Sequence, residues 1–233
     1  MSKTGEKGEA EQILSEQAHQ KIKRDIINGA LLPGEKLQLE TISERYGIGQ
    51  APVREALNRL SAEGWASRRS QRGFFVSEIS MSDLVELVKT RIWLETRALS
   101  ESLANATTEW EDKLIVAYHR LARTARLGTE GDIKTLNADW EERHHAFHLQ
   151  LLANCGSAWM IQFCSVMMDQ SVRYRNLSVN FTRARRGDAL AEHKAILNAV
   201  LDRDIGLSCE LLTAHYTRTL QGLKDRLEGD PSL

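Results

Sequence analysis

The pattern of apolar and polar positions divides the chain into two parts. From residue 13 to about residue 80, short apolar-periodic segments alternate with glycine and proline, which predicts short helices and strands. From residue 81 to residue 227, apolar residues recur three and four positions apart without proline, which predicts long helices and no strand. These helices are expected at residues 81–104, 109–127, 132–153, 157–180, 184–202 and 204–227.

The expected architecture is therefore mainly α, with a small N-terminal domain followed by an all-α antiparallel helical bundle. The predicted boundaries are a disordered lead-in at 1–12, a first domain at 13–80, a helical domain at 81–228 and a tail at 229–233. The lead-in is assigned from its polar composition alone.

The first domain has the order of a winged helix-turn-helix. The run "LETISERYGIGQAPVREALNRLSAEGW" predicts two helices separated by a sharp break at residues 47–49. The run "WASRRSQRGFFVSEI" then predicts two strands joined at residues 71–73, where glycine supplies a positive φ. In the second helix, Val53, Ala56, Leu57 and Leu60 form an apolar stripe, and the outward positions are Gln50, Arg54, Asn58 and Arg59.

The net charge of the chain is close to zero, but one segment is clearly basic. The chain has 31 basic and 32 acidic residues, so no overall charge favours nucleic acid or membrane. Between residues 52 and 76, however, the sequence contains only two acidic residues and five basic ones, Arg54, Arg59, Arg68, Arg69 and Arg72. A charged, solvated helix is the ordinary explanation of such a stretch. A basic second helix followed at once by a basic hairpin is more specific, and it favours binding to double-stranded DNA.

The cysteines and the hydropathy of the chain indicate the cellular compartment of the protein. Cys155, Cys164 and Cys209 lack the C-x-x-C spacing of a thiolate zinc site, and their odd number argues against a disulfide framework. The N-terminal residues contain no apolar signal segment, and no window is apolar enough to span a membrane. We expect a cytoplasmic protein.

The helical domain carries an unusual histidine run, "WEERHHAFHLQLL". His144 and His148 lie four apart and so face the same side of a helix, whereas His145 is rotated away. His193 and His215 lie at the edges of apolar helix faces further along the chain. Four neutral imidazoles suit Zn²⁺, Ni²⁺ or Cu²⁺. On spacing alone, buried structural histidines are the more common explanation.

An enzyme is the alternative class. Glu141 and Glu142 each precede a histidine by three residues, as in di-iron carboxylate bundles. A second such pair on another helix of the bundle is missing, because Leu190 and Leu212 stand three positions before His193 and His215, and both glutamates are expected at the surface. The motifs H-E-x-x-H, G-x-S-x-G and the P-loop are also absent. A metal-dependent enzyme built on the bundle remains the alternative to a regulator.

The N-terminal segments resemble the GntR family of regulators. The similarity lies in "IINGALLPGEKL", "APVREALNRL" and "RGFFV". The resemblance implies DNA contacts at Lys36, Gln50, Arg54, Arg72 and Gly73, to which Arg59 is added as an outward-facing basic residue. Here Gly49-Gln50-Ala51 replaces the family's usual Ser-Arg-Thr, so a different operator sequence is expected.

The helical half resembles the FCD domain of the FadR subfamily, in its CsiR-like branch, through "WEERHHAFH", "AEHKAILNAVLDRD" and the later "HY". The resemblance implies a divalent metal, Zn or Ni, on His144, His148, His193 and His215, with His144 in place of the usual aspartate. It also implies a repressor controlled by a small organic acid. Arg91 and Arg173 are candidates to bind that carboxylate, although each can instead form an exposed salt bridge, such as Arg91 with Glu95. A two-fold DNA operator would require a homodimer.

Overall fold

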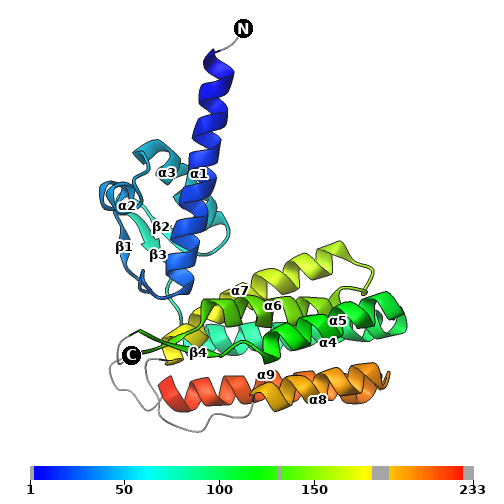
Figure 1. Cartoon of the computed structure of the whole chain (residues 1–233). Helices are drawn as coiled ribbons and strands as arrows, with labels where there is room; N and C mark the ends of the chain where they lie inside the picture. The colour runs from blue at the N-terminus through cyan, green and yellow to red at the C-terminus, as the bar shows by residue number, and fades with distance from the viewer. Residues whose placement is uncertain (1–2, 131–132, 180–188, 228–233) are drawn as a thin grey trace. The chain divides into compact units, whose positions relative to one another are not determined.

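The computed structural model describes residues 3–130, 133–179 and 189–227, which form two compact units divided between Ile79 and Ser80 (Figure 1). The predicted tail at 229–233 and the first residues of the helix predicted at 184–202 lie outside the described residues. Within the described part, no helix is both long enough and apolar enough to cross a membrane.

The first unit contains three helices and a three-stranded sheet among its described residues. The helices are α1 (Lys3–Ile27), α2 (Leu39–Tyr46) and α3 (Gln50–Ala62). Between α2 and α3, Gly47 adopts a φ of 66°, a left-handed conformation that glycine enters without a Cβ clash and that ends α2. The break between the two helices is where the sequence predicts it.

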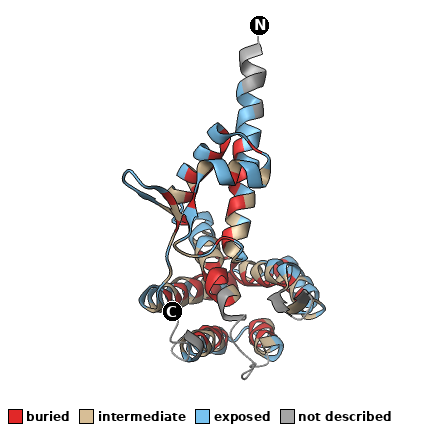
Figure 2. Cartoon of the chain, turned by 90° about the vertical axis from the view of Figure 1, so that its left-hand side faces the viewer, coloured by how far each residue is buried: buried red, intermediate tan, exposed pale blue. Residues whose placement is uncertain are grey.

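The wing is a hairpin of β2 (Ala66–Arg69) and β3 (Gly73–Val76), and β1 (Lys36–Leu37) pairs with the other edge of β3. The strands are antiparallel, with Arg69 opposite Gly73 at the turn. Both Gln71 and Gly73 have positive φ there, at 58° and 91°. Figure 2 shows this hairpin extending from the first unit with its tip exposed.

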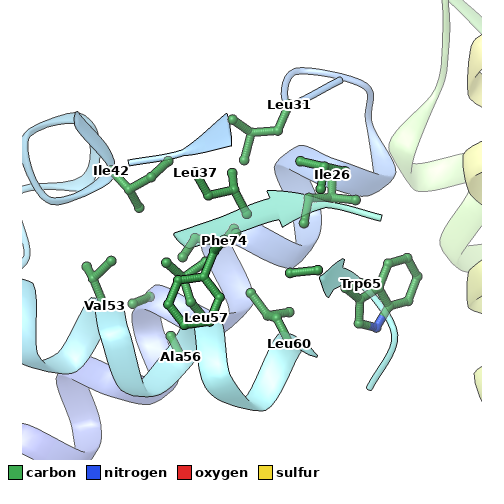
Figure 3. Close-up of a cluster of buried hydrophobic side chains, with 14 of the residues drawn as sticks. Ile26, Leu31, Leu37, Ile42, Val53, Ala56, Leu57, Leu60, Trp65 and Phe74 are labelled. Carbon is green, nitrogen blue, oxygen red and sulfur yellow. The ribbon is translucent and has the colours of Figure 1, made fainter. Parts of the chain in front are cut away.

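The core of the first unit lies between the sheet and the helices. Figure 3 shows Leu37 and Phe74 of the sheet directed towards Leu57 and Leu60 of α3. Helix α1 packs along α3 and contributes Ala18 and Ile22, which are fully buried. Burial of this apolar face holds the exposed side of α3 in a fixed orientation.

The second unit is helical, as predicted. Its helices are α4 (Met81–Ala104), α5 (Thr108–Ala122), α6 (Ala138–Leu152), α7 (Ala158–Val179), α8 (Ala189–Leu201) and α9 (Ile205–Leu227). Side-chain oxygens of Ser80, Thr107 and Asn137 accept backbone N–H bonds at the starts of α4, α5 and α6. Helix α9 lies along α4 and pairs with α8, and α7 packs against both α4 and α6 (Figure 1).

Two expectations are corrected. The second unit is not all-α, because β4 (Leu127–Glu130) and β5 (Ile133–Leu136) form an antiparallel hairpin where helix ends were predicted. These strands are only four residues long, too short for their periodicity to be distinguished from that of a helix end.

The predicted disordered lead-in is also wrong, because α1 begins at Lys3. Glu, Lys, Ala and Gln are good helix formers, and extending an existing helix avoids the cost of nucleation. The buried residues of α1 further along supply that existing helix.

The packing of α1 gives a stability prediction. Replacing buried Ile22 by alanine should cost about 2–5 kcal/mol, because it removes core contacts and leaves a cavity. Replacing Ile13, which is 58% exposed on the same helix, should change stability by about 0.5 kcal/mol or less. Native-state hydrogen exchange of α3 amides measures both, and equal effects would contradict the packing described.

Candidate metal centre and DNA-binding surface

Helix α6 presents two histidines to the interior of the second unit. His144 and His148 are 6% and 1% exposed, and their ring centroids lie 4.5 Å apart. The indole of Trp140, one turn before, stacks on His144 with a centroid distance of 4.6 Å. Their four-residue spacing places both imidazoles on the same buried face.

Helices α8 and α9 bring the other two histidines to the same place. His193 lies 4.9 Å from His144 between ring centroids, and His215 lies 4.7 Å from His193. One nitrogen from each of the four rings can be chosen so that all lie within 4.8 Å of one another. We call these four residues the histidine cluster. The structure thus brings together the four predicted metal ligands, which are far apart in sequence.

The hydrogen bonds of the cluster suit a metal ion. His193 Nδ1 is bonded to the carbonyl oxygen of Ala189, and His215 Nδ1 to Glu192 Oε2 at 2.7 Å. Because a carbonyl and a carboxylate can only accept, both Nδ1 atoms carry the proton and both Nε2 atoms keep a lone pair. The Nε2 atoms of His148 and His193 are 3.2 Å apart, close to the roughly 3.3 Å that separates two nitrogens on one tetrahedral zinc ion.

The protonation of the cluster also favours metal binding. Burial lowers the pKa of His144 and His148 well below the usual value, and the neighbouring histidines add to the effect. Burial lowers the pKa of His193 to about 3, and it lowers that of His215 against the opposing influence of Glu192. At neutral pH the rings are therefore uncharged, which is the state that binds a metal. The four histidines can hold a metal ion.

The two predicted effector residues occupy different surroundings. Arg91 of α4 forms the expected pair with Glu95, at 2.7 Å from Nε to Oε1, but both side chains are buried rather than exposed. Arg91 also donates to Ser171 Oγ at 3.1 Å. Arg173 of α7 is buried, and it donates to Gln170 Oε1 at 3.4 Å. Two of the N–H donors of Arg91 are thus already hydrogen-bonded within the unit.

The sequence reasoning missed Arg175, which lies two residues after Arg173. Its charge contributes to lowering the pKa of His144, His148 and His215, although burial is the largest cause in each case. Its Nε and Nη2 atoms bond to the two carboxylate oxygens of Glu141, at 3.0 and 2.6 Å. Glu141 is therefore not an ordinary surface residue, as was expected, because it is 11% exposed at the side chain and neutralises an arginine beside the cluster. No sequence pattern connects these two residues.

His145 is directed away from the cluster, as its position on the helix predicts. Its Nε2 lies 3.3 Å from Ser165 Oγ and 3.5 Å from a carboxylate oxygen of Asp169. The third histidine of the run is thus a partly exposed residue of the α6–α7 interface.

The candidate DNA-binding surface lies on α3 and the wing. Gln50 and Arg54 are exposed on the first two turns of α3, on the side opposite its buried stripe. Lys36 on β1 is exposed, as are Arg72 and Gly73 at the hairpin turn. Arg59 differs, because its Nη1 donates to Glu16 Oε2 of α1 at 2.8 Å. Its charge is partly satisfied within the unit.

Each half of the chain matches a known protein family. Residues 14–76 match the family described as bacterial regulatory proteins, gntR family, and residues 86–218 match the FCD domain. The chain belongs to the GntR family of regulators with an FCD domain. The FCD match includes α6, α8 and most of α9, so it contains all four histidines of the cluster.

Similar proteins are also named as regulators. The HTH-type transcriptional regulator BphR of Paraburkholderia xenovorans is 36% identical over 207 residues, covering 89% of this chain and 84% of its own. The HTH-type transcriptional repressor GlaR of Escherichia coli is 29% identical over 221 residues, covering 94% and 99%. These relatives identify this GntR-family protein as a transcriptional regulator and decide against the enzyme alternative.

Solved structures show the same fold. The E. coli protein McbR/YncC superposes with a TM-score of 0.71 at 22% identity, covering 92% of this chain and 98% of its own. A GntR protein from Rhodococcus sp. RHA1 gives a TM-score of 0.70 at 17% identity, covering 91% and 97%. The fold of this GntR-family regulator is therefore shared with distant relatives.

The cluster gives a direct test by metal content. Purified protein should carry about one divalent metal ion per chain, and the pair of substitutions His148→Ala and His193→Ala should abolish it, because two nitrogens do not make a closed site. His145→Ala, one residue from a proposed ligand but directed elsewhere, serves as the control and should keep the metal. Elemental analysis after dialysis makes the measurement. Unchanged metal in the double variant would rule out the cluster as the site.

Proposed function

We propose that the protein is a transcriptional repressor whose affinity for a DNA operator is set by a small carboxylate effector bound at a metal ion in the histidine cluster. The observation that carries the proposal is the burial of four neutral imidazoles around one point. These four proposed ligands are all histidines, and none is a carboxylate. A divalent cation there keeps its full charge and so attracts an anion.

The metal is proposed to be zinc or nickel. Imidazole nitrogen suits both ions, and structural or catalytic zinc sites of histidine are tetrahedral. The 3.2 Å separation of the two Nε2 atoms is compatible with two imidazole ligands on one such ion. When bound, the metal would accept an effector oxygen as a fifth ligand beside the four histidine nitrogens, and the residues of the chain would orient the effector.

Arg175 is the proposed second contact for the effector, in preference to Arg173. Its guanidinium offers two parallel donors to the carboxylate of Glu141. Its charge also contributes to lowering the pKa of three histidines of the cluster. An effector carboxylate can replace Glu141 at this fork with the same geometry. Glu141 would then act as the internal anion with which the effector competes.

The proposed DNA contacts are the exposed residues of α3, β1 and the wing. A recognition helix enters the major groove with its N-terminal residues next to the bases, which is where Gln50 and Arg54 lie. Operators read in this way are commonly two-fold symmetric, so we propose a homodimer acting in the cytoplasm. Repression is the function named for the E. coli relative GlaR. The effector then changes DNA affinity only to the extent that it binds one arrangement of the dimer more tightly.

The DNA contact of Arg54 can be tested by substitution. Arg54→Ala should weaken operator binding by roughly 5- to 150-fold, the loss of about 1–3 kcal/mol expected for one base-contacting arginine. The control is Arg97→Ala, which removes the same charge from an exposed position of α4. Gel shifts at fixed salt compare the two. Equal binding by Arg54→Ala and the wild type would reject the assignment.

The effector contact can be tested by a matched pair of variants. Dicarboxylates of four to six carbons are first screened for a rise in the Tm of metal-loaded protein. For a compound that raises it, Arg175→Lys should reduce affinity by roughly tenfold or more, because lysine lacks the two-donor fork, and Arg173→Lys should have little effect. Chelation should abolish the response. A larger loss in Arg173→Lys than in Arg175→Lys would restore the sequence-based choice.

A further inference from the structure

A chain of buried polar side chains leads away from the histidine cluster. It begins at His148 on α6, passes through Tyr216 on α9 and continues to Glu95 and Arg91 on α4. All four residues are at most 4% exposed. Buried polar groups are costly unless each is hydrogen-bonded, so the order of donors and acceptors in this chain is constrained.

The direction of each hydrogen bond follows from Glu95. It receives two guanidinium contacts from Arg91, at 2.7 and 3.5 Å, and therefore acts as a carboxylate that only accepts. The hydroxyl of Tyr216 donates its single proton to Glu95 Oε2 at 2.5 Å. The oxygen of Tyr216 must then accept at its 3.0 Å contact with His148 Nδ1. His148 consequently carries its proton on Nδ1.

This proton position decides whether His148 can bind a metal. With Nδ1 protonated, Nε2 keeps its lone pair and faces the lone pair of His193 Nε2 at 3.2 Å, an arrangement that a cation between them stabilises. With the proton on Nε2 instead, His148 would donate to His193, and that hydrogen bond would occupy both proposed ligand atoms.

Arg91 completes the chain in two ways. Its charge compensates Glu95 in a buried environment, and its guanidinium lies over the ring of Tyr216 at 4.3 Å from the centroid. Its hydrogen bond to Ser171 of α7 fixes it from a third helix. Arg91 therefore holds both the carboxylate and the phenol in place.

We propose that Tyr216, Glu95 and Arg91 form a positioning relay that keeps the proton of His148 on Nδ1 and thereby prepares its Nε2 to bind the metal. This inference rests on the metal binding in the proposed function, and it needs neither the effector nor the operator. It reassigns Arg91 from an effector contact to a residue that acts through Glu95 and Tyr216.

The test compares two tyrosines that differ in one respect. Tyr216→Phe removes the hydroxyl that contacts His148. Tyr174→Phe removes a buried hydroxyl that donates to Asp83 at 2.5 Å instead of contacting a histidine. Zinc affinity of the full chain is measured by competition with a chromogenic chelator. Tyr216→Phe should weaken zinc binding by roughly 10- to 100-fold, as outer-shell substitutions do, and Tyr174→Phe by less than about twofold.

A double-variant cycle tests whether the residues act in series. Glu95→Gln alone should weaken zinc binding to a similar degree, and Tyr216→Phe with Glu95→Gln should lose little more than either single variant. Circular dichroism with excess chelator checks that each metal-free variant is folded. If Glu95→Gln does not fold, because Arg91 is then buried without its partner, the two tyrosine variants decide the question alone.

The outcomes separate this inference from the proposed function. Wild-type zinc affinity in Tyr216→Phe, or equal losses in both tyrosine variants, would overturn the relay and leave the metal site intact. Absence of zinc binding in the wild type would overturn the proposed metal site, and the relay with it. A selective loss in Tyr216→Phe supports both.

Discussion

The arrangement of the second unit depends on the burial of four imidazole rings at one point. Each ring must be uncharged to be buried without a counterion, and each buried ring nitrogen needs a partner. His193 and His215 bond through Nδ1 to Ala189 and Glu192, and His148 contacts Tyr216. These bonds direct the unused nitrogens towards one another. Helices α6, α8 and α9 are therefore fixed relative to one another by polar as well as apolar contacts.

The charges around the cluster are balanced in pairs. Arg91 is matched by Glu95 and Arg175 by Glu141, so neither arginine opposes a cation as strongly as a free charge would. Glu95 belongs to α4, which starts at Met81, directly after the boundary between the two units. Part of the polar support for the proposed metal site thus lies on the first helix of the second unit.

Local patterns predicted much of this structure. Helical periodicity predicted α2, α3 and the helices of the second unit, and the position of Gly73 predicted the wing turn, since these features depend on neighbouring residues. Spacing placed His144 and His148 on one face. The hairpin at 127–136 was missed because strands this short carry little periodicity. The helix at residues 3–12 was missed because these residues are polar. Their composition does not reveal that the following part of α1 is held in the helical conformation by its buried residues.

The remaining features depend on contacts between distant segments. The pair Arg91 and Glu95 is visible as a four-residue spacing, but its burial follows from the packing of α4 against α7 and α9. The choice between Arg173 and Arg175 depends on which side of α7 meets Glu141, and one sequence does not determine that. Arg59 was expected on the DNA surface, and only the packing of α1 on α3 reveals its pairing with Glu16.

The most direct test of the account is X-ray absorption at the zinc edge of the metal-loaded protein. The histidine cluster predicts imidazole nitrogens at about 2.0–2.1 Å from zinc, with the multiple-scattering signature of several histidines and no sulfur. A first shell dominated by sulfur at about 2.3 Å, or by oxygen alone, would contradict a metal held by His144, His148, His193 and His215.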